Sequence, residues 1–386
     1  MPDKSDLTQE ETLRYSRHLL LPEVGVEGQR KLKESSVLLV GTGGLGSAIA
    51  IYLAAAGVGH IGLVDYDVVD ISNLQRQVVH GTSRLGQPKV ESARDRLHDI
   101  NPLIQIDIYN TALNSQNAWE VSDGYDVLVD GTDNFPTRYL LNDLAVFSHR
   151  PYVYGSVFRF EGQVSLFDAR SGPCYRCLFP EPPPPGSVPS CGEAGVFGVL
   201  PGTIGTLQAT ETIKYLLGLG EPMTGRLLLY DALEMSFETM RISKREDCPV
   251  CGSQPSITQL IDYEEFCGVP IDDRVFVAKD PRWTISATEL AQRLSEDTQI
   301  ELVDVREPHE LEISRIPGAK LIPLNTLPAH LSELDGSKTI VVFCRTGTRA
   351  ARALDLLRSA GFQNVLVLDG GVNAWVQEVD PSMPVY

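Results

Sequence analysis

Long apolar runs are absent from this sequence of 386 residues. No stretch approaches the roughly 20 apolar residues of a membrane-spanning helix. The segment from Met1 to Arg17 is polar and charged, and lacks the apolar core of a signal peptide. We therefore expect a cytoplasmic protein that does not bind membranes. A hydrophobic content of 42% at this length suits two or three globular domains.

Positive charge is also scarce. Lys and Arg number 33 against 51 Asp and Glu, which gives a formal net charge of −18. Such a chain repels nucleic acids and anionic membrane surfaces, so neither is expected as a partner. The sequence has seven cysteines, an odd number, and no export signal. Metal binding and thiol chemistry therefore explain these cysteines better than disulfide bonds do.

The segment from Val37 to Asp67 has the pattern of a nucleotide-binding βαβ unit. Val37–Val40 and Ile61–Val64 are apolar runs that predict buried strands, and Ser47–Ala56 predicts a packed helix between them. The loop before this helix has the spacing G-x-G-x-x-G, and its glycines are Gly41, Gly43, Gly44 and Gly46. Such a loop lets the backbone approach a phosphate, and Asp65 follows the second strand, where an acid can bind a ribose hydroxyl.

Further patterns extend this unit into a fold. Alternation from Tyr152 to Phe167 predicts antiparallel strands, and Ser5–Lys33 is predicted to be helical, with Thr8 as its N-cap and Glu11 completing a capping box. A second α/β unit is predicted from about Arg282 to Tyr386. The expected fold class is α/β: a doubly wound, mostly parallel sheet with a Rossmann-like nucleotide site and an antiparallel extension, plus a smaller α/β domain.

Polar residues follow the predicted strands at the edge where a doubly wound sheet binds ligands. Two cations for a phosphate chain and a carboxylate able to hold Mg²⁺ suit ATP better than a dinucleotide. Taken singly, Arg76 and Lys89 are equally well explained as solvated surface charges and Asp133 as a helix N-cap; together they favour a functional site. The full set is Asp67, Asn73, Arg76, Lys89, Asp133 and Asn134.

These motifs, in this order, resemble the MoeB/ThiF adenylyltransferases, bacterial relatives of ubiquitin-activating enzymes, over about Asp6 to Ser253. The resemblance rests on the glycine loop, Asp65, Arg14–Arg17, Ser72–Gln77, Gly86–Lys89 and Thr132–Asn134. It implies binding of ATP and Mg²⁺, and adenylation of the C-terminal carboxylate of a ubiquitin-like sulfur-carrier protein. It also implies a homodimer in which Arg17 reaches the neighbouring subunit's ATP. Asp65 would then bind the ribose, Asp133 the Mg²⁺, and the phosphates would be bound by Asn73, Arg76 and Lys89.

Two C-x-x-C pairs, Cys174 with Cys177 and Cys248 with Cys251, predict a structural zinc site. Four thiolates can close a tetrahedral shell around one ion, which would join distant segments of the chain. The alternative is a redox dithiol, although two pairs in one domain favour zinc.

Two further cysteines stand alone. Cys191 follows the Pro-rich stretch Glu181–Ser190, which we interpret as an extended surface loop. In the family that the sequence resembles, this loop crosses the activated carrier, so Cys191 is a candidate acceptor of the acyl group. The alternative is a small apolar residue without a role, and this is our interpretation of Cys267.

Cys344 lies between the predicted strand Thr339–Phe343 and a predicted helix, and Arg345 and Arg349 flank it closely. A helix N-terminus and two cations lower the pKa of a thiol, and the amides of the loop can bind an anion. The loop resembles the active loop of rhodaneses, and the resemblance covers about Arg282 to Met383. It implies that Cys344 carries a persulfide.

A cysteine phosphatase is the rival interpretation of this loop. Phosphatases have five residues between the cysteine and the arginine, whereas four separate Cys344 from Arg349. The tighter ring of amides fits a persulfide better than a phosphate. Arg315 stands where rhodanese-like sequences often have histidine, and its role is open.

Together these motifs predict three parts: an adenylyltransferase domain (1–253), a linker (254–281) and a sulfurtransferase domain (282–386). The combination resembles fused adenylyltransferase–sulfurtransferases of the MoeZ type. The sulfur donor, for example a cysteine desulfurase or thiosulfate, is open, as are the carrier and the pathway (molybdopterin, thiamine, cysteine or tRNA thiolation). The alternatives are a dinucleotide-dependent oxidoreductase with an appended sulfur domain and a non-catalytic scaffold that binds carrier proteins.

Overall fold

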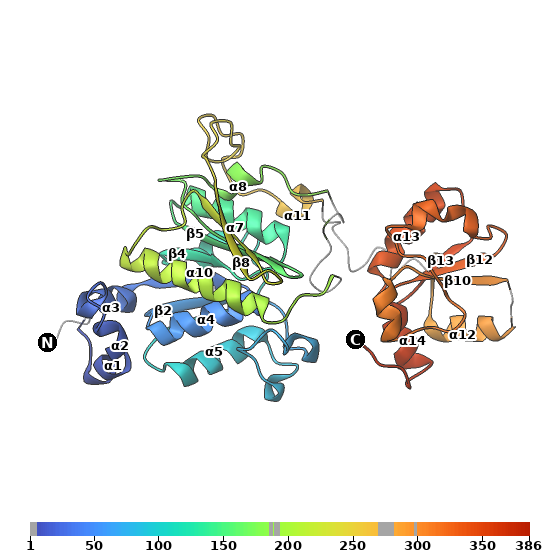
Figure 1. The fold of residues 1–386 in the computed structure, drawn as a ribbon, viewed down its shortest axis with the longest axis horizontal. Helices are drawn as coiled ribbons and strands as arrows, with labels where there is room; N and C mark the ends of the chain where they lie inside the picture. The colour runs from blue at the N-terminus through green and yellow to red at the C-terminus, as the bar shows by residue number, and fades with distance from the viewer. Residues whose placement is uncertain (1–5, 185–187, 189–193, 269–281, 297–298) are drawn as a thin grey trace. The chain divides into compact units, whose positions relative to one another are not determined.

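The computed structural model describes residues 6–184, 188, 194–268, 282–296 and 299–386. The chain divides into two compact units, Met1–Gly268 and Val269–Tyr386, and each is built on a sheet of its own (Figure 1). Among the described residues, no helix combines the length and the apolar character needed to cross a bilayer.

The first unit contains an eight-stranded sheet with the order β3-β2-β1-β4-β5-β6-β7-β8. The strands from β3 to β5 are parallel, and those from β5 to β8 are antiparallel. This arrangement confirms the predicted doubly wound sheet with an antiparallel extension. The strands are β1 (Ser36–Val40), β2 (His60–Val64), β3 (Gln105–Tyr109), β4 (Val127–Asp130), β5 (Tyr152–Phe158), β6 (Glu161–Phe167), β7 (Arg226–Asp231) and β8 (Ser236–Arg241).

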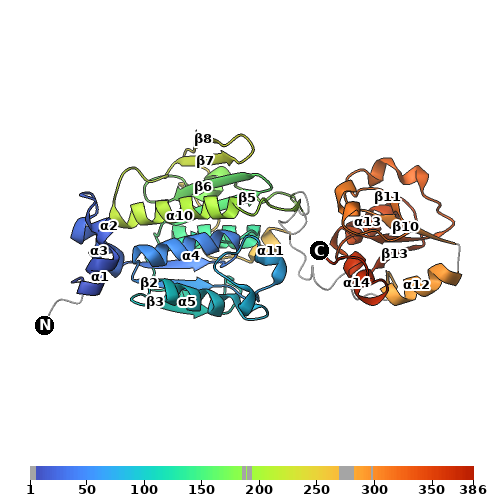
Figure 2. The same cartoon turned by 60° about the horizontal axis from the view of Figure 1, so that its bottom comes forward.

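Helices cover both faces of this sheet (Figures 1 and 2). One face carries α4 (Gly44–Ala56), α5 (Lys89–Ile100) and α10 (Leu200–Leu217), and the other carries α7 (Phe135–Phe147). In β1, Val37 and Leu39 pack into the core that contains α4, while Leu38 points to the opposite face. Burial on both faces explains why the strand is a continuous apolar run.

The centre of the sheet places the site. β2 and β4 flank β1, with Val37 opposite Ile61 on one side and Val127 on the other. The order of the strands reverses here, so the loops that follow β1, β2 and β4 leave the same carboxyl edge and enclose a crevice.

The N-terminal segment forms three helices rather than the single helical segment expected from Ser5 to Lys33. They are α1 (Gln9–Arg14), α2 (Ser16–Leu19) and α3 (Gly25–Glu34). The capping box of Thr8 and Glu11 is confirmed. Pro22 lies between α2 and α3, and Gly25, whose φ is +56°, is the first residue of α3. Neither residue suits a helix interior, so one helix does not run through this segment.

Shorter elements complete the first unit. They are α6 (Ala118–Ser122), α8 (Tyr175–Leu178), α11 (Tyr263–Phe266) and the 3₁₀ turns η1 (Ile71–Asn73) and η2 (Thr82–Arg84). α11 lies within the stretch that we expected to be linker, and it packs against α7 of the first unit. The first unit therefore extends to Gly268.

The second unit contains a five-stranded parallel sheet with the order β11-β10-β12-β13-β9. Ile340 and Val342 of its central strand face the core beneath α13, and Val341 and Phe343 face the core beneath α12 and α14. The elements are β9 (Thr284–Ile285), α12 (Ala287–Glu296), β10 (Ile300–Asp304), η3 (Pro308–Glu312), β11 (Lys320–Leu321), η4 (Leu327–Ala329), η5 (Leu331–Glu333), β12 (Thr339–Phe343), α13 (Thr348–Ser359), β13 (Val365–Leu368) and α14 (Gly371–Glu378).

Candidate functional site

The glycine loop of the first unit is folded too tightly for larger residues. Gly41 has a φ of +90°, and a Cβ on Gly46 would lie 1.9 Å from the Gly41 carbonyl oxygen. A Cβ on Gly131, at the end of β4, would lie 2.3 Å from the same oxygen. Close contact among these three backbones turns the start of α4 toward the crevice, where Gly43 and Gly44 line the pocket.

Asp65, at the end of β2, fixes this loop. Its Oδ2 accepts hydrogen bonds from the Thr42 amide at 2.8 Å and the Thr42 hydroxyl at 3.0 Å, and its Oδ1 accepts one from the Asp67 amide at 2.9 Å. His80 holds the other side of Thr42, with its Nε2 3.1 Å from the Thr42 carbonyl oxygen. Burial lowers the pKa of His80, so the ring is neutral at physiological pH.

The predicted polar residues gather around one pocket at the carboxyl edge of the sheet. Its lining combines the glycine loop with both predicted cations and the predicted carboxylates. It also contains Gln77, from the motif Ser72–Gln77, and Tyr66 and Thr111, which sequence reasoning missed. Arg17 is exposed on α2 and does not line this pocket. Cys191 lies outside the described residues. The predicted residues in the lining are Gly41, Gly43, Gly44, Asp65, Asp67, Asn73, Arg76, Lys89, Asp133 and Asn134.

The two cations of the pocket are held by different means. The Lys89 side chain is 6% exposed, and its Nζ lies 2.9 Å from Oδ2 of the half-exposed Asp67. Arg76 donates to the Ser72 carbonyl oxygen at 3.0 Å and to the Asn73 side chain at 3.4 Å. Gln77 donates to the same Asn73 oxygen at 2.7 Å, so the turn after η1 is fixed from both sides. Both cations line the pocket together with Gly43 and Gly44 at the start of α4.

The loop after β4 contains an exposed acidic residue, Asp133, next to the helix-capping residue Asn134. Asn134 is the N-cap of α7 and accepts a hydrogen bond from the Thr137 amide at 2.9 Å. Asp133 is exposed and is not the N-cap of α7, because Asn134 has that role. The buried Asp130 accepts hydrogen bonds from the amide and hydroxyl of Thr132 and thereby sets the path of this loop.

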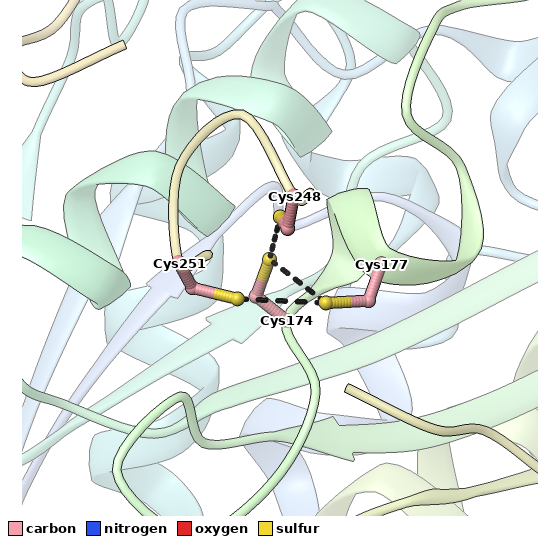
Figure 3. Close-up of side chains that lie close together, drawn as sticks. All are labelled: Cys174, Cys177, Cys248 and Cys251. Carbon is pink, nitrogen blue, oxygen red and sulfur yellow. Dashed lines mark hydrogen bonds between the residues drawn. The ribbon is translucent and has the colours of Figure 1, made fainter. Parts of the chain in front are cut away.

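The two C-x-x-C pairs come together, as Figure 3 shows. The Sγ atom of Cys174 lies 3.6 Å from that of Cys248, and Sγ of Cys177 lies 3.4 Å from that of Cys251. All four Sγ atoms lie within 4.8 Å of one another. Zinc–sulfur bonds of about 2.3 Å in a tetrahedron place the sulfurs about 3.8 Å apart, so the cluster fits one zinc ion.

In the second unit, Cys344 follows β12 and lies at the base of a short loop that leads into α13. Its Sγ accepts a hydrogen bond from the Gly347 amide at 3.2 Å. Gly347 has a φ of +112°, which turns the chain into the helix. Gly371 allows α14 to approach, because a Cβ there would lie 2.4 Å from the Cys344 carbonyl oxygen. The sulfur therefore faces the Gly347 amide at the N-terminus of α13.

Arg349 is held beside this loop by a carboxylate that sequence reasoning missed. Its two terminal nitrogens donate to the two oxygens of Glu310 at 2.6 and 2.7 Å. Burial alone would raise the pKa of Glu310, but hydrogen bonds from Arg349 and from the Glu307 amide lower it to about 2. Glu310 is 39 residues from Arg349, so no local spacing could have identified the pair.

The first unit thus has the features of a protein that binds a nucleotide at its glycine loop, and the second those of a thiol-based transfer domain. Comparison with known families agrees: residues 15–250 match the ThiF family and residues 286–378 match the rhodanese-like domain. The chain belongs to the ThiF family and carries a rhodanese-like domain.

Several relatives match over nearly the whole chain. The probable adenylyltransferase/sulfurtransferase MoeZ of Mycobacterium tuberculosis is 49% identical over 388 residues, which cover 99% of this chain and 97% of that protein. The adenylyltransferase and sulfurtransferase MOCS3 of Drosophila sechellia is 44% identical, over 98% of this chain and 86% of that protein.

Solved structures resemble the fold of this chain. Escherichia coli MccB with ATP has a TM-score of 0.56 and 22% identity, and covers 65% of this chain and 77% of that chain. MccB with MccA-N7isoASN has a TM-score of 0.57 and 23% identity, and covers 62% of this chain and 75% of that chain. At this identity the likeness concerns the fold alone.

Proposed function

We propose that this protein adenylates the C-terminal carboxylate of a ubiquitin-like sulfur-carrier protein with ATP, and then replaces the adenylate with sulfur carried on Cys344. It is an adenylyltransferase and a sulfurtransferase in one chain. One observation carries the proposal. A pocket with two cations at a glycine loop, and a cysteine whose sulfur accepts a hydrogen bond from the amide that precedes a helix, occur in separate units of the same polypeptide.

Adenylation needs positioning more than proton transfer. A carrier carboxylate, already ionised, attacks the α-phosphorus of ATP, and pyrophosphate leaves with the bond electrons. Arg76 and Lys89 stabilise the charge that builds up on the phosphate oxygens, and the amides at the start of α4 bind a phosphate. Asp65 and Asn73 complete the nucleotide site, with the ribose assigned to Asp65. The exposed Asp133 is the residue that would hold Mg²⁺, which neutralises phosphate charge when bound.

Sulfur transfer uses the second unit. The terminal sulfur of the Cys344 persulfide attacks the acyl carbon and AMP leaves, which produces an acyl disulfide on Cys344. A thiol reductant then attacks the Cys344 sulfur and releases the thiocarboxylate. Cys191 is a candidate to receive the acyl group before the persulfide does. Arg345 and Arg349 stabilise the anionic sulfur.

Several further assignments belong to the same proposal. The four clustered cysteines hold a structural Zn²⁺. The protein works in the cytoplasm as a homodimer, in which Arg17 of one chain serves the ATP of the other. The sulfur comes from a cysteine desulfurase or from thiosulfate. Support for these assignments is the family membership and, for zinc, the sulfur–sulfur distances.

The test is to mix the protein with ATP, Mg²⁺, thiosulfate, a thiol reductant and each candidate carrier, and to measure by mass spectrometry the exchange of a carrier oxygen for sulfur. Cys344→Ala is expected to stop this exchange and to leave ATP–pyrophosphate exchange intact. Loss of both reactions in Cys344→Ala would contradict the division of labour. A protein that binds NAD but not ATP would instead be the oxidoreductase, and one without pyrophosphate exchange would be a scaffold.

A further inference from the structure

Tyr386 contacts Arg345, in the loop that carries Cys344, and residues that hold this loop in place, although it lies far from the loop in sequence. Its hydroxyl donates to Oε1 of Glu310 at 3.0 Å and accepts from Nη1 of Arg306 at 2.7 Å. Its ring lies under the guanidinium of Arg345, with 5.4 Å between the guanidinium carbon and the ring centroid. Its carbonyl oxygen accepts a hydrogen bond from the side chain of Asn373 at 3.3 Å.

The partners that hold the hydroxyl are themselves rigidly fixed. Arg306 is fully buried and paired with Asp304 at the end of β10, with 2.7 Å between Nη2 and Oδ2. It also donates to the carbonyl oxygen of Ser314 at 2.9 Å. The Tyr386 hydroxyl is therefore anchored to the sheet, and the anchor extends through Glu310 to Arg349.

The Tyr386 ring packs against the guanidinium of Arg345. Arg345 directly follows Cys344, and its carbonyl oxygen accepts a hydrogen bond from the Asn373 amide at 3.1 Å. Asn373 thus fixes the backbone of Arg345 and the carbonyl of Tyr386, while the Tyr386 ring supports the guanidinium. A cation over an aromatic face is attracted by the ring quadrupole, and the effect grows where water is partly excluded.

We propose that Tyr386 is a positioning residue for sulfur transfer: its ring orients Arg345, and its hydroxyl, through Glu310, orients Arg349. This inference rests on the proposed function of Cys344. Tyr386 itself does not contact the sulfur. An anionic sulfur at Cys344 needs both guanidinium groups in fixed places, since small displacements of a charge-stabilising group cost large factors in rate.

Three variants separate the two contributions. Tyr386→Phe keeps the ring and removes the hydroxyl, Tyr386→Ala removes both, and Val385→Ala, at an exposed neighbouring residue, is the matched control. Each is made in the full chain. The measurements are kcat and KM for thiosulfate, the pH profile of Cys344 alkylation by iodoacetamide followed on its own peptide, and ATP–pyrophosphate exchange.

Tyr386→Ala should lower kcat for thiosulfate at least about tenfold and shift the midpoint of Cys344 alkylation to higher pH. Tyr386→Phe, which keeps the ring under Arg345, should show a smaller shift of the alkylation midpoint and a smaller loss of kcat. Val385→Ala should match the wild type in every measurement. ATP–pyrophosphate exchange should be unchanged in all three variants. A wild-type kcat and a wild-type alkylation profile in Tyr386→Ala would overturn the inference. Equal shifts of the alkylation profile in Tyr386→Phe and Tyr386→Ala would also overturn it. If wild-type protein accepts no sulfur from any donor, the proposed function fails instead, while the alkylation profile still tests Tyr386.

Discussion

The Lys89 side chain is almost fully buried, whereas its partner carboxylate, Asp67, is half-exposed. Its Nζ is within hydrogen-bond distance of Asp67 inside the pocket. Arg76 lines the same pocket. We expect Lys89→Ala and Arg76→Ala each to reduce ATP–pyrophosphate exchange by about a hundredfold or more, since each removes a charge from the proposed phosphate site. Folding should survive, because Asp67 remains hydrated.

Arg84 provides the matched control for this pair. It lies in the same connection between β2 and α5, forms an ion pair with Asp95, and does not line the pocket. Arg84→Ala should keep wild-type exchange. Exchange at the wild-type rate in Lys89→Ala, or an equal loss in all three variants, would refute the assignment of Lys89 to the phosphates.

Glu310 predicts how the second unit responds to acid. Its ordinary pKa is 4.5, and the folded chain lowers it to about 2. The folded state therefore keeps this carboxylate ionised at a pH where the unfolded chain has protonated it. The stability that Glu310 contributes is complete above about pH 4.5 and is lost as the pH falls toward 2. Glu310→Gln should flatten the pH dependence of the free energy of unfolding between about pH 4.5 and 2.

Tryptophan fluorescence can measure this effect in the full chain. Trp119→Phe leaves Trp283 and Trp375, both in the second unit, so urea unfolding then reports on that unit alone. Glu312→Gln, at an exposed neighbour of Glu310, should keep the wild-type slope between pH 4.5 and 2. Identical slopes in both variants would mean that the pair with Arg349 contributes nothing.

Residues with local signatures could be identified from the sequence, and residues defined by long-range contacts could not. The glycine spacing placed Gly41 and Asp65 correctly at the carboxyl edge. The same spacing gave no sign that Asp65 holds the loop through Thr42, or that His80 supports it. Tyr386 had no signature at all, because its partners lie 76 and 80 residues away.

At the scale of elements, the junction of β1 and α4 depends on the contact between two glycines. Gly46→Ala would place a methyl group against the backbone oxygen of Gly41. We expect a loss of at least about 2–3 kcal/mol in the free energy of unfolding of the first unit. Gly202→Ala, in α10, has no atom within 4 Å of the new Cβ and should be neutral or stabilising by up to about 1 kcal/mol. Urea titration followed by circular dichroism measures both, and equal stabilities would contradict the steric argument.

The cysteine cluster joins α8 to the segment that contains Cys248 and Cys251, and α8 in turn contacts α11 through Arg176. Arg176 lies between two predicted zinc ligands, is fully buried, and pairs with Asp143 at 2.8 Å. The hydroxyl of Tyr263 donates to the same carboxylate at 2.8 Å, and the Phe266 ring lies 4.5 Å from the guanidinium carbon. The position of α11 therefore depends on the segment that the metal would hold in place.

Metal loss is therefore expected to expose Cys267, which follows α11. This thiol is buried, and burial raises its pKa to about 11, so it should resist alkylation in the native protein. Chelation of zinc, or Cys251→Ser, should make Cys267 much more reactive toward iodoacetamide, as measured on its peptide. The peptide of Cys344, in the other unit, is the internal control. Unchanged labelling of Cys267 after metal loss would contradict this coupling.

Elements with strong periodicity or buried apolar runs could be predicted, and peripheral ones could not. β1, β2 and β12 lie where apolar runs placed them, within one residue at either end. Strand β8 had no such signal, because all its residues are exposed. It forms only by pairing with β7, and the pairing of an edge strand depends on a partner rather than on its own pattern.

At the scale of the whole molecule, each unit has its own core and supplies the groups of its own site. In the proposed function the adenylate forms in the first unit and the sulfur is carried in the second, so a covalent group must pass between them. If the second unit serves whichever adenylate it encounters, two inactive chains should complement each other. A mixture of Lys89→Ala, which is expected to lose most adenylation, and Cys344→Ala, which is expected to lose sulfur transfer, should therefore regain thiocarboxylate formation.

The recovered rate should rise with protein concentration and stay below the wild-type rate at micromolar protein. The covalent connection between the units raises their effective concentration to about the millimolar range, which free chains do not reach. Each variant alone and a double variant carrying both substitutions are the controls, and mass spectrometry of the carrier is the measurement. No recovery at any concentration would show that sulfur passes only within one chain, and the connection between the units would then be part of the catalytic machinery.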